Sequence, residues 1–384
     1  MPGPVASRVV AALTFGLHTP RFREPGPLSN RDLDTMSGNF HFFKGSIVVT
    51  VVGLGLAAAL GWYLHGTASG VAATVFIAAM LALLEVSLSF DNAVVNASVM
   101  QDMTPVWRQR FLTWGMGIAV FGMRFVFPLV VVSVVAHIGP IEAVRLATFE
   151  PNEYARLIHS AHVPLGAFGG SFLGMVCLKY FFDAEKDIHW IAALERRLSA
   201  LGRFEAIEVG VTLLGLYAFS RAFPAPEALE FLVAGVFGLV TFIGVDGIGA
   251  VMAPEEGAKH DARRAGIASF LYLNVLDATF SFDGVIGAFA LTNNLFIIAI
   301  GLGIGAMFVR SLTIMLVDKG TLASYRYLEH GAFYAIGALA LIMLMGTLFE
   351  VPDVVTGSIG AAFIALSLWS SIRFNKAHRP AANG

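Results

Sequence analysis

The chain has 384 residues, of which 57% are hydrophobic and 14% are charged, with a net charge of −2. Soluble domains carry about 25% charged residues, so this composition excludes an ordinary soluble protein and predicts an integral membrane protein, in agreement with a mean hydropathy of +0.73. The chain has no long run of basic residues that would point to nucleic acid as a partner. Because Cys177 is its single cysteine, an intrachain disulfide and a multi-cysteine metal site are excluded.

Residues 1–45 differ from the rest of the chain because Arg, Pro, Asp and Asn are mixed through them. Their apolar run, 9–17, is too short to cross a bilayer. A signal peptide is the alternative interpretation, but no small-residue cleavage site is evident after the run. We therefore expect a cytoplasmic N-terminal tail.

Ten apolar segments follow, each near the roughly 20 residues that a helix needs to cross the hydrocarbon core. They are 46–64, 71–90, 112–136, 163–182, 206–223, 229–251, 267–290, 295–317, 331–349 and 354–372. We therefore expect an all-α, polytopic membrane protein of about ten transmembrane helices. Residues 46–225 would form a first membrane repeat, 226–372 a second, and 373–384 a cytoplasmic C-terminal tail.

The distribution of Lys and Arg between the connections predicts the orientation of these helices. With the N-terminus inside, nineteen of these residues fall on the inner side, and only Arg145, Arg156 and Arg221 fall on the outer side. Because cytoplasmic connections carry an excess of positive charge, we expect both termini in the cytoplasm. A bacterial inner membrane is the expected location.

A short acidic signature occurs twice within the apolar segments, 192 residues apart. In each copy two carboxylates lie six positions apart, and Ser-Phe directly precedes the second of them. The key residues are Glu85, Ser89, Asp91 and Asn92 in the first copy and Asp277, Ser281, Asp283 and Gly284 in the second. Repetition of such an unusual motif in a membrane protein predicts one shared site.

The duplication continues beyond the acidic signature. Two glycines and an arginine follow each copy at the same spacing: Gly115, Gly117 and Arg124, then Gly301, Gly303 and Arg310. Each half would hold five spans, and an odd number inverts the second half relative to the first. Inverted repeats are common among secondary transporters, whose substrate site lies near the midplane where the repeats meet. We expect this architecture here.

The charges of the signature indicate what such a site would bind. One intramembrane carboxylate costs about 2.5–3.5 kcal/mol on insertion scales, so the four acids require compensation, which Arg124 and Arg310 can supply. Two negative charges then remain, which suits a divalent cation. Hard oxygen donors favour Mg²⁺, Ca²⁺ or Mn²⁺ over Zn²⁺. The predicted ligands are Glu85, Ser89, Asp91, Asn92, Asp277, Ser281 and Asp283. Structural ion pairing between helices is the alternative role for these carboxylates.

Helix geometry limits this prediction. Positions six apart lie about 120° from superposition on an unbroken helix, so the two carboxylates of one copy do not share a face. Both reach one site only if the backbone breaks near Ser89 and Phe90, where short polar side chains can bond to the backbone. Gly284 and Gly287 permit a break in the second copy. We therefore predict discontinuous helices in both copies.

The first motif, with Glu85, Leu88, Ser89, Asp91 and Asn92, resembles the TerC family of integral membrane proteins, which is named for tellurium resistance. The second motif, Ser281 to Asp283, resembles that family's second acidic motif. The resemblance implies membership of a wider superfamily of exporters with members tied to manganese efflux. Gly284, the long N-terminal tail and the extended 137–162 connection depart from the pattern. They favour an uncharacterised sister family and leave the metal open.

Several further residues have a plain structural interpretation. The glycines after each motif are expected to let helices pack closely. Asp246 either lines the pathway or marks the end of its helix. The histidines, among them His330, are expected at interfaces or in loops and not as metal ligands.

These features predict a transporter that exports a divalent metal ion, with Mn²⁺ expected as the substrate and no resident cofactor. Two alternatives stay open. An intramembrane aspartyl hydrolase would use two aspartates as acid and base, but the Gly-x-Gly-Asp motif typical of such proteases is missing. A non-transporting membrane scaffold would instead bind cytoplasmic stress-response proteins. The oligomeric state is left open.

Overall fold

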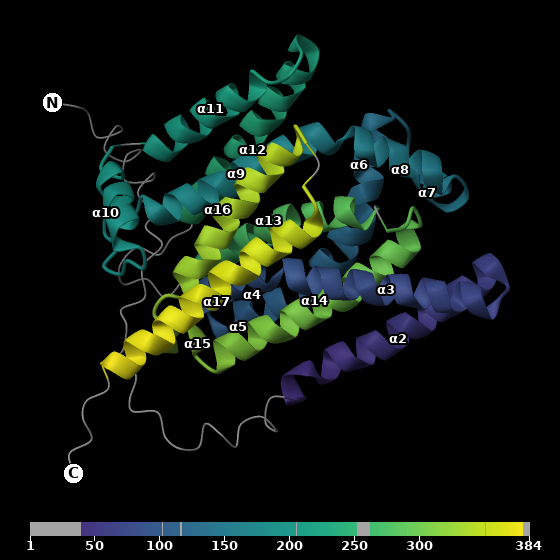
Figure 1. Cartoon of the computed structure of the whole chain (residues 1–384), viewed down its shortest axis with the longest axis horizontal. Coiled ribbons are helices and arrows are strands. Elements are labelled where there is room, and N and C mark those ends of the chain that lie inside the picture. Colours follow the sequence, from purple (N-terminus) through teal and green to yellow (C-terminus); the bar gives the residue numbers. More distant parts are fainter. Residues whose placement is uncertain are drawn as a thin grey trace.

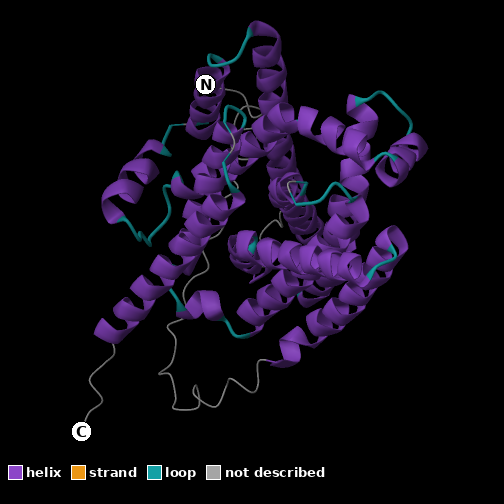
Figure 2. Ribbon diagram, turned by 45° about the vertical axis from the view of Figure 1, so that its right-hand side comes forward, coloured by secondary structure: helices purple, strands orange, loops and turns teal. Residues whose placement is uncertain are grey.

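The computed structural model describes residues 40–101, 103–115, 117–204, 206–251, 262–289, 291–349 and 351–378. The expected N-terminal tail lies almost entirely outside these residues, as does the end of the C-terminal tail. Throughout the described part, the secondary structure is helical and contains no strand (Figure 2). The all-α prediction is confirmed for these residues.

The helices follow one another along the chain with short connections (Figure 1). In chain order they are α2 (Phe40–His65), α3 (Ala68–Leu88), α4 (Phe90–Gln101), α5 (Pro105–Arg110), η2 (Phe111–Gly115), η3 (Ile118–Val126), α6 (Phe127–Val135), α7 (Pro140–Phe149), α8 (Pro151–Ser160), α9 (His162–Phe181), α10 (Ala192–Leu201), α11 (Ile207–Ser220), α12 (Ala225–Val251), α13 (Ala262–Ala288), α14 (Leu295–Asp318), α15 (Thr321–Ser324), α16 (Leu328–Gly346) and α17 (Asp353–Ala377). The elements η2 and η3 are π-helical.

Eight helical segments of the described residues are long and apolar enough to cross a membrane. They are His41–His65, Ala68–Leu88, Pro105–Val134, His162–Phe181, Ala225–Ile248, Leu295–Asp318, Leu328–Gly346 and Val355–Ala377. The chain is therefore an integral membrane protein, with eight candidate spans in place of the expected ten. Of the other two expected spans, α11 has only 14 residues, and α13 has 27 residues and carries the second acidic motif.

The helices pack as two bundles. In one, α14 lies against α2 and α3, and in the other α9 packs on α12 and α16, with α17 against α16 (Figure 1). Helix α4 contacts both α14 and α16, while α13 contacts both α9 and α14. The two helices that carry most of the acidic signatures therefore lie at the junction of the bundles.

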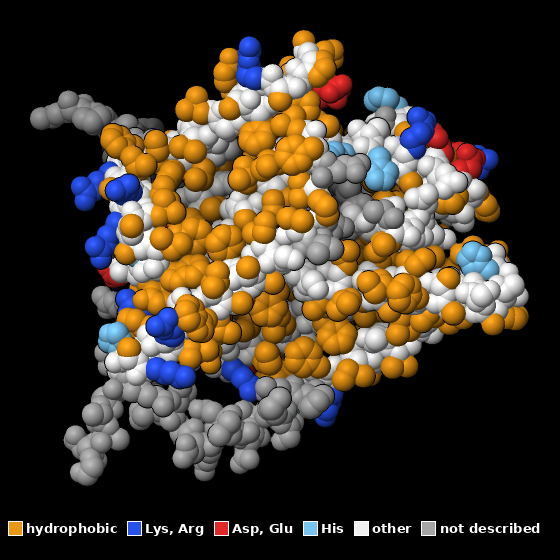
Figure 3. Space-filling view, in the orientation of Figure 1, with side chains coloured by type: hydrophobic (Ala, Val, Ile, Leu, Met, Phe, Trp, Pro, Cys, Tyr) orange, Lys and Arg blue, Asp and Glu red, His pale blue; other side chains and the backbone are white. Residues whose placement is uncertain are grey.

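Apolar side chains cover much of the outer surface, as expected for a protein in lipid. Figure 3 shows hydrophobic side chains spread across one face, with Lys and Arg mainly near its edges. Among the exposed side chains are Val51 on α2, Phe76 on α3 and Phe237 on α12, each at least 60% exposed. Such large apolar groups lose nothing by facing hydrocarbon, so this surface fits a bilayer.

The predicted helix break is present in the first copy of the signature. Helix α3 ends at Leu88, Ser89 has a non-helical backbone (φ −102°, ψ 17°), and α4 begins at Phe90. The same prediction is wrong for the second copy, because α13 continues from Ala262 to Ala288. A glycine permits a break but does not require one, and Gly284 stays helical within α13.

Candidate functional site

The two acidic signatures lie side by side where α4 packs against α13. Asn96 on α4 donates a hydrogen bond from Nδ2 to Asp277 Oδ1 at 2.8 Å, and both residues are buried. Asn96 is not among the predicted ligands. It lies four positions after Asn92 and therefore on the same face of α4, which is the sequence signal that points to it.

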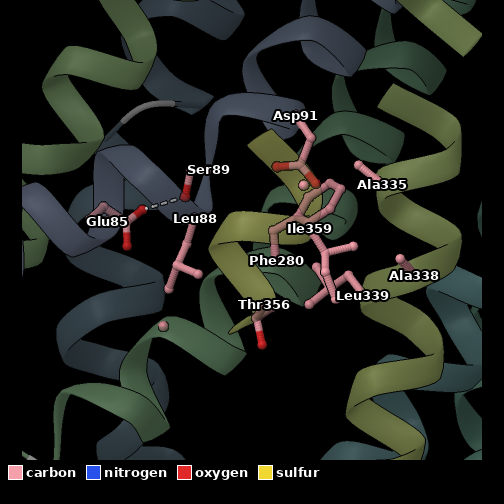
Figure 4. Close-up of a pocket in the computed structure, with 12 residues that line it drawn as sticks. Glu85, Leu88, Ser89, Asp91, Phe280, Ala335, Ala338, Leu339, Thr356 and Ile359 are labelled. Atoms are coloured by element: carbon pink, nitrogen blue, oxygen red, sulfur yellow. Dashed lines mark hydrogen bonds between the residues drawn. The ribbon is translucent and has the colours of Figure 1, made fainter. Parts of the chain in front are cut away.

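Two cavities with carboxylates in their walls adjoin this contact within the described residues. The first, here called the Asp91 cavity, has an empty volume of about 450 Å³ and opens between α3, α4, α13, α16 and α17. Its lining residues are Glu85, Leu88, Ser89, Asp91, Phe280, Gly284, Ala335, Ala338, Leu339, Thr356, Ile359 and Gly360. Figure 4 shows Glu85 and Ser89 joined on one side of this cavity, with Asp91 apart from them. Thr356 of α17 also lines the cavity.

The second cavity, here called the Asp277 cavity, has an empty volume of about 310 Å³. It is lined by Glu85, Asn92, Asn96, Ala119, Arg124, Asp277, Ser281, Ala306, Val309, Arg310 and Thr313. Its walls come from α3, α4, η3, α13 and α14, so residues from both halves of the sequence contribute. Glu85 is the residue that lines both cavities.

Glu85 is held by a buried ion pair with Arg124. The two residues are only 2% and 4% exposed, and Ser89 Oγ adds a hydrogen bond to Glu85 Oε1 at 2.9 Å. Arg124 also donates to the backbone oxygen of Ala119. The predicted compensation of a motif carboxylate by Arg124 is therefore visible as a direct contact.

Arg310 has a different position. Its Nε donates a hydrogen bond to the backbone oxygen of Leu112 at 2.8 Å, and its side chain lines the Asp277 cavity. Within the described residues it forms no ion pair with a motif carboxylate. The predicted compensation of a motif carboxylate by Arg310 is therefore not visible as a direct contact in the described residues.

Glycines bring the helix of Glu85 against its neighbours. A Cβ at Gly305 would lie 2.5 Å from Glu85 Cβ, and a Cβ at Gly301 would lie 2.5 Å from Leu81 Cβ. These two positions let α14 approach α3 closely, as the sequence predicts for the glycine runs. A Cβ at Gly284 would lie 3.2 Å from Glu85 Oε2, so the glycine that replaces Asn in the second copy leaves room for this carboxylate.

The predicted ligands thus divide between two neighbouring cavities. Glu85, Ser89 and Asp91 line the Asp91 cavity, while Glu85, Asn92, Asp277 and Ser281 line the Asp277 cavity. The side chain of Asp283 lies outside the part that the structure describes. Across the described residues, no group of three or more His, Cys, Asp or Glu side chains is arranged to hold a metal ion. Each cavity is instead lined by two carboxylates, Glu85 with Asp91 or Glu85 with Asp277, together with neutral oxygens.

Two of these neutral oxygens are buried without a hydrogen-bond partner in the described part of the chain. They are Asn92 Oδ1 and Asn96 Oδ1, on the α4 face that lines the Asp277 cavity. Most buried polar atoms in native proteins are hydrogen-bonded, so acceptors without a donor call for an explanation. Amide and carboxylate oxygens together form the kind of donor set that hard divalent cations accept.

Some lining residues carry no signal in the sequence. Thr356 comes from α17, an apolar span without a motif, and Thr313 comes from α14, outside the repeated glycine and arginine positions. Arg124 lies in η3, and π-helical turns occur frequently at functional sites. None of these features follows from spacing or composition, because each depends on how distant helices meet.

Two further charged contacts lie away from the cavities. Asp246 pairs with Lys179 of α9, which gives it a partner between two spans. Glu195 on α10 is 1% exposed and accepts backbone hydrogen bonds from Trp190 and Ile191. Around it lie Lys186, His189 and His330, at 3.7, 3.7 and 3.4 Å from Oε2.

The Glu195 cluster, formed by Glu195, Lys186, His189 and His330, attaches the connection after α9 to the start of α16. His330 Nε2 lies 2.8 Å from the backbone oxygen of Ile188, and Lys186 Nζ lies 3.5 Å from the ring centroid of Tyr180. His330 is therefore at an interface, as expected. The burial of Glu195 and Lys186 is not visible in the sequence, which reads as an ordinary polar connection.

The family model described as "Protein of unknown function (DUF475)" matches residues 90–378, which is most of the chain. The chain belongs to the DUF475 family. The DUF475 match includes Asp91, Asn92, Arg124 and the second acidic signature but begins just after Glu85 and Ser89. No curated protein and no solved structure matches the chain. The family description names no activity and no tie to TerC, so that resemblance stays a prediction.

Proposed function

We propose that the protein is a membrane transporter that moves a divalent cation, with Mn²⁺ as the expected substrate, through the Asp91 and Asp277 cavities. The observation that carries the proposal is the pair of cavities at the junction of the two bundles, which share Glu85 and are lined by carboxylate, amide and hydroxyl oxygens. Polar and ionised groups inside a membrane protein usually mark a substrate or ion pathway.

The donor types support a hard cation as substrate. Asp91 and Asp277 supply carboxylates, while Asn92 and Asn96 supply buried amide oxygens without other partners in the described residues. Mg²⁺, Ca²⁺ and Mn²⁺ accept such oxygens, whereas Zn²⁺ and Cu⁺ prefer sulfur or imidazole. The resemblance to TerC favours Mn²⁺ within this group.

The proposed architecture follows from the duplication in the sequence, which divides the membrane helices into two halves. Helices α11 and α13 would join the eight candidate spans to give ten, arranged as two inverted five-helix repeats. The cation would be exported by alternating access, with the two bundles opening to either side of the membrane in turn. The protein would lie in a bacterial inner membrane with both termini in the cytoplasm.

The hydrolase alternative receives less support. An acid and base pair requires two carboxylates that face one substrate and share a proton, but Asp91 and Asp277 line different cavities, and Glu85 is paired with Arg124. The scaffold alternative has no specific support in the described residues. It predicts that neutralising Asp91 leaves a metal or tellurite stress phenotype unchanged, while truncation of the N-terminal tail abolishes it.

Cation uptake into inverted membrane vesicles tests the proposal. Mn²⁺, Ca²⁺, Mg²⁺ and Zn²⁺ are compared for the wild type, Asp91→Asn and Asp277→Asn, with the exposed Glu142→Gln on α7 as control. Mn²⁺ uptake should fall at least tenfold in both site variants, because each removes a ligand charge worth about 1.4 kcal/mol or more. The control should keep full activity. Equal uptake by all four proteins would rule out the proposed site.

A further inference from the structure

Glu85 has a position that transport alone does not explain. Its side chain lines the Asp91 cavity on one side and the Asp277 cavity on the other. Arg124 lines the second cavity and pairs with Glu85. The ion pair therefore lies where the two cavities approach each other and forms part of the wall between them.

The pair also decides how much negative charge each cavity offers. With Glu85 neutralised by Arg124, the described side chains leave Asp91 as the remaining carboxylate of one cavity, while the other holds Asp277 together with the positively charged Arg310. One carboxylate neutralises a monovalent cation but leaves a divalent cation with an uncompensated charge in a low-dielectric site. Release of Glu85 from Arg124 would supply the second negative charge.

Arg124 is held by few contacts for a buried guanidinium. Its described partners are Glu85 and the backbone oxygen of Ala119, and its buried Nε has no hydrogen-bond partner among the described residues. Guanidinium has five N–H donors, and each buried donor that stays unpaired costs free energy. Separation from Glu85 therefore breaks one of the two described hydrogen bonds of this guanidinium.

The backbone around Arg124 allows such a movement. Arg124 lies within the π-helical element η3, and the backbone N–H of Phe127 donates to the oxygen of Gly122, five positions earlier. A π-helical turn holds one more residue than an α-helical turn. A local change from π to α geometry would rotate Arg124 about the helix axis without unfolding the segment.

From these observations we propose that Arg124 is a tethered competitor of the transported cation for Glu85. A divalent cation takes Glu85 from Arg124 and is neutralised by Glu85 together with Asp91, and the withdrawal of Arg124 joins the two cavities. Monovalent cations gain too little from a second carboxylate to break the pair. Arg124 is thus a positioning residue for Glu85 that selects divalent ions. This inference rests on the proposed transport function.

Initial Mn²⁺ uptake rates in proteoliposomes test the inference through the separate effects on KM and kcat. Arg124→Gln removes the competitor, so KM for Mn²⁺ should fall about tenfold, within the usual range of coupling between sites. The kcat should fall as well, because Glu85 then releases the cation slowly. Arg124→Lys keeps the charge and should return both values toward the wild type. Arg145→Gln, which removes an exposed arginine paired with Glu142 on α7, is the control and should change neither value.

The double variant Glu85→Gln/Arg124→Gln keeps the site neutral and similar in size, so it tests the inference even if Arg124→Gln fails to fold. It should raise KM for Mn²⁺ at least tenfold, because the second carboxylate is absent. Wild-type KM and kcat in the double variant would show a purely structural pair and overturn the inference. An unchanged or raised KM in folded Arg124→Gln would do the same.

Failure of this inference is distinguishable from failure of the proposed function. If Asp91→Asn loses Mn²⁺ uptake while the double variant behaves as the wild type, the transport site stands and the role of Arg124 is rejected. If the wild type transports none of the four divalent cations, the proposed function fails and the inference fails with it.

Discussion

At the scale of single residues, the protein buries charged groups at a cost in free energy, and these groups differ in how many hydrogen-bond and ion-pair partners they have. Glu195 is surrounded by backbone donors and basic side chains, whereas the Nζ of Lys186 lies over the ring of Tyr180 and 3.7 Å from Glu195 Oε2. Burial lowers the pKa of Lys186 to about 8, although Glu195, Glu329 and Asp183 act in the opposite direction. A buried amine in this position resists protonation in the folded state.

This pKa predicts a stability that depends on pH. Between about pH 8 and the ordinary value of 10.5, unfolded chains hold a proton at Lys186 that the folded protein has released, so the free energy of unfolding rises with pH by at most about 3 kcal/mol. In the Lys186→Arg variant the side chain stays charged in the folded and the unfolded state, so the free energy of unfolding does not show this increase with pH. The Tm of the wild type relative to Lys186→Arg should therefore increase from pH 7.5 to 9.5 in detergent solution.

The exposed Lys376 on α17 provides the matched control. Lys376→Arg should follow the wild type at every pH, because its side chain reaches solvent in both states. A constant Tm difference between the wild type and Lys186→Arg across this pH range would contradict the prediction.

At the scale of helices, the contact between α3 and α14 determines where Glu85 can lie. Gly301 and Gly305 are one turn apart on α14 and both face α3, whereas Gly303 between them faces Val120 with room for a methyl group. This contact has the small-residue spacing common in membrane helix pairs. The carboxylate thus owes its place to glycines on a helix more than 200 residues later in the chain.

Alanine substitutions on α14 test this contact. A Cβ at position 305 would lie 2.5 Å from Glu85 Cβ and 2.8 Å from the backbone oxygen of Ala82. Gly305→Ala should therefore lower stability by about 1–3 kcal/mol, the usual cost of overpacking. In Gly303→Ala the added Cβ would lie 3.5 Å from the nearest atom, Val120 Cγ1, so little change in stability is expected. Thermal unfolding in detergent measures the stability of both variants. Equal Tm values for the two variants would contradict the predicted close approach of α14 to α3.

The same helices show how far the sequence could predict the site. The six-residue spacing of Glu85 and Asp91 correctly required a break at Ser89, because helical periodicity is a local property. The break expected near Gly284 is absent, since that glycine serves to accommodate Glu85 from another helix. Thr356, the π-helical turns around Arg124 and the division into two cavities depend on packing between distant segments, which no local pattern contains.

At the scale of the whole molecule, both bundles contain helices from both halves of the sequence. Helix α14 comes from the second half but packs on α2 and α3, and α9 comes from the first half but packs on α12 and α16. Apolar composition was sufficient to predict the membrane class and eight of the spans. It could not decide how α11 and α13 lie relative to the bilayer, because α11 is short and α13 carries charged motif residues.

Cysteine labelling tests the predicted orientation, because Cys177 is the single cysteine of the chain. In a Cys177→Ser background, Ser69→Cys lies in the first turn of the second span and His378→Cys lies just after the last span, and both positions are exposed. With a cytoplasmic N-terminus, a membrane-impermeant maleimide should label Ser69→Cys in intact cells and His378→Cys only after permeabilisation. The reverse pattern would reject the assigned orientation.

The exchange of helices between the halves has a consequence for biogenesis. Glu85 enters the membrane before Arg124, its ion-pair partner 39 positions later, and long before Gly305 and the rest of α14. Until those segments are synthesised, α3 has an uncompensated carboxylate and an unoccupied packing face. The packing of α3 therefore cannot be completed before α14 has been synthesised.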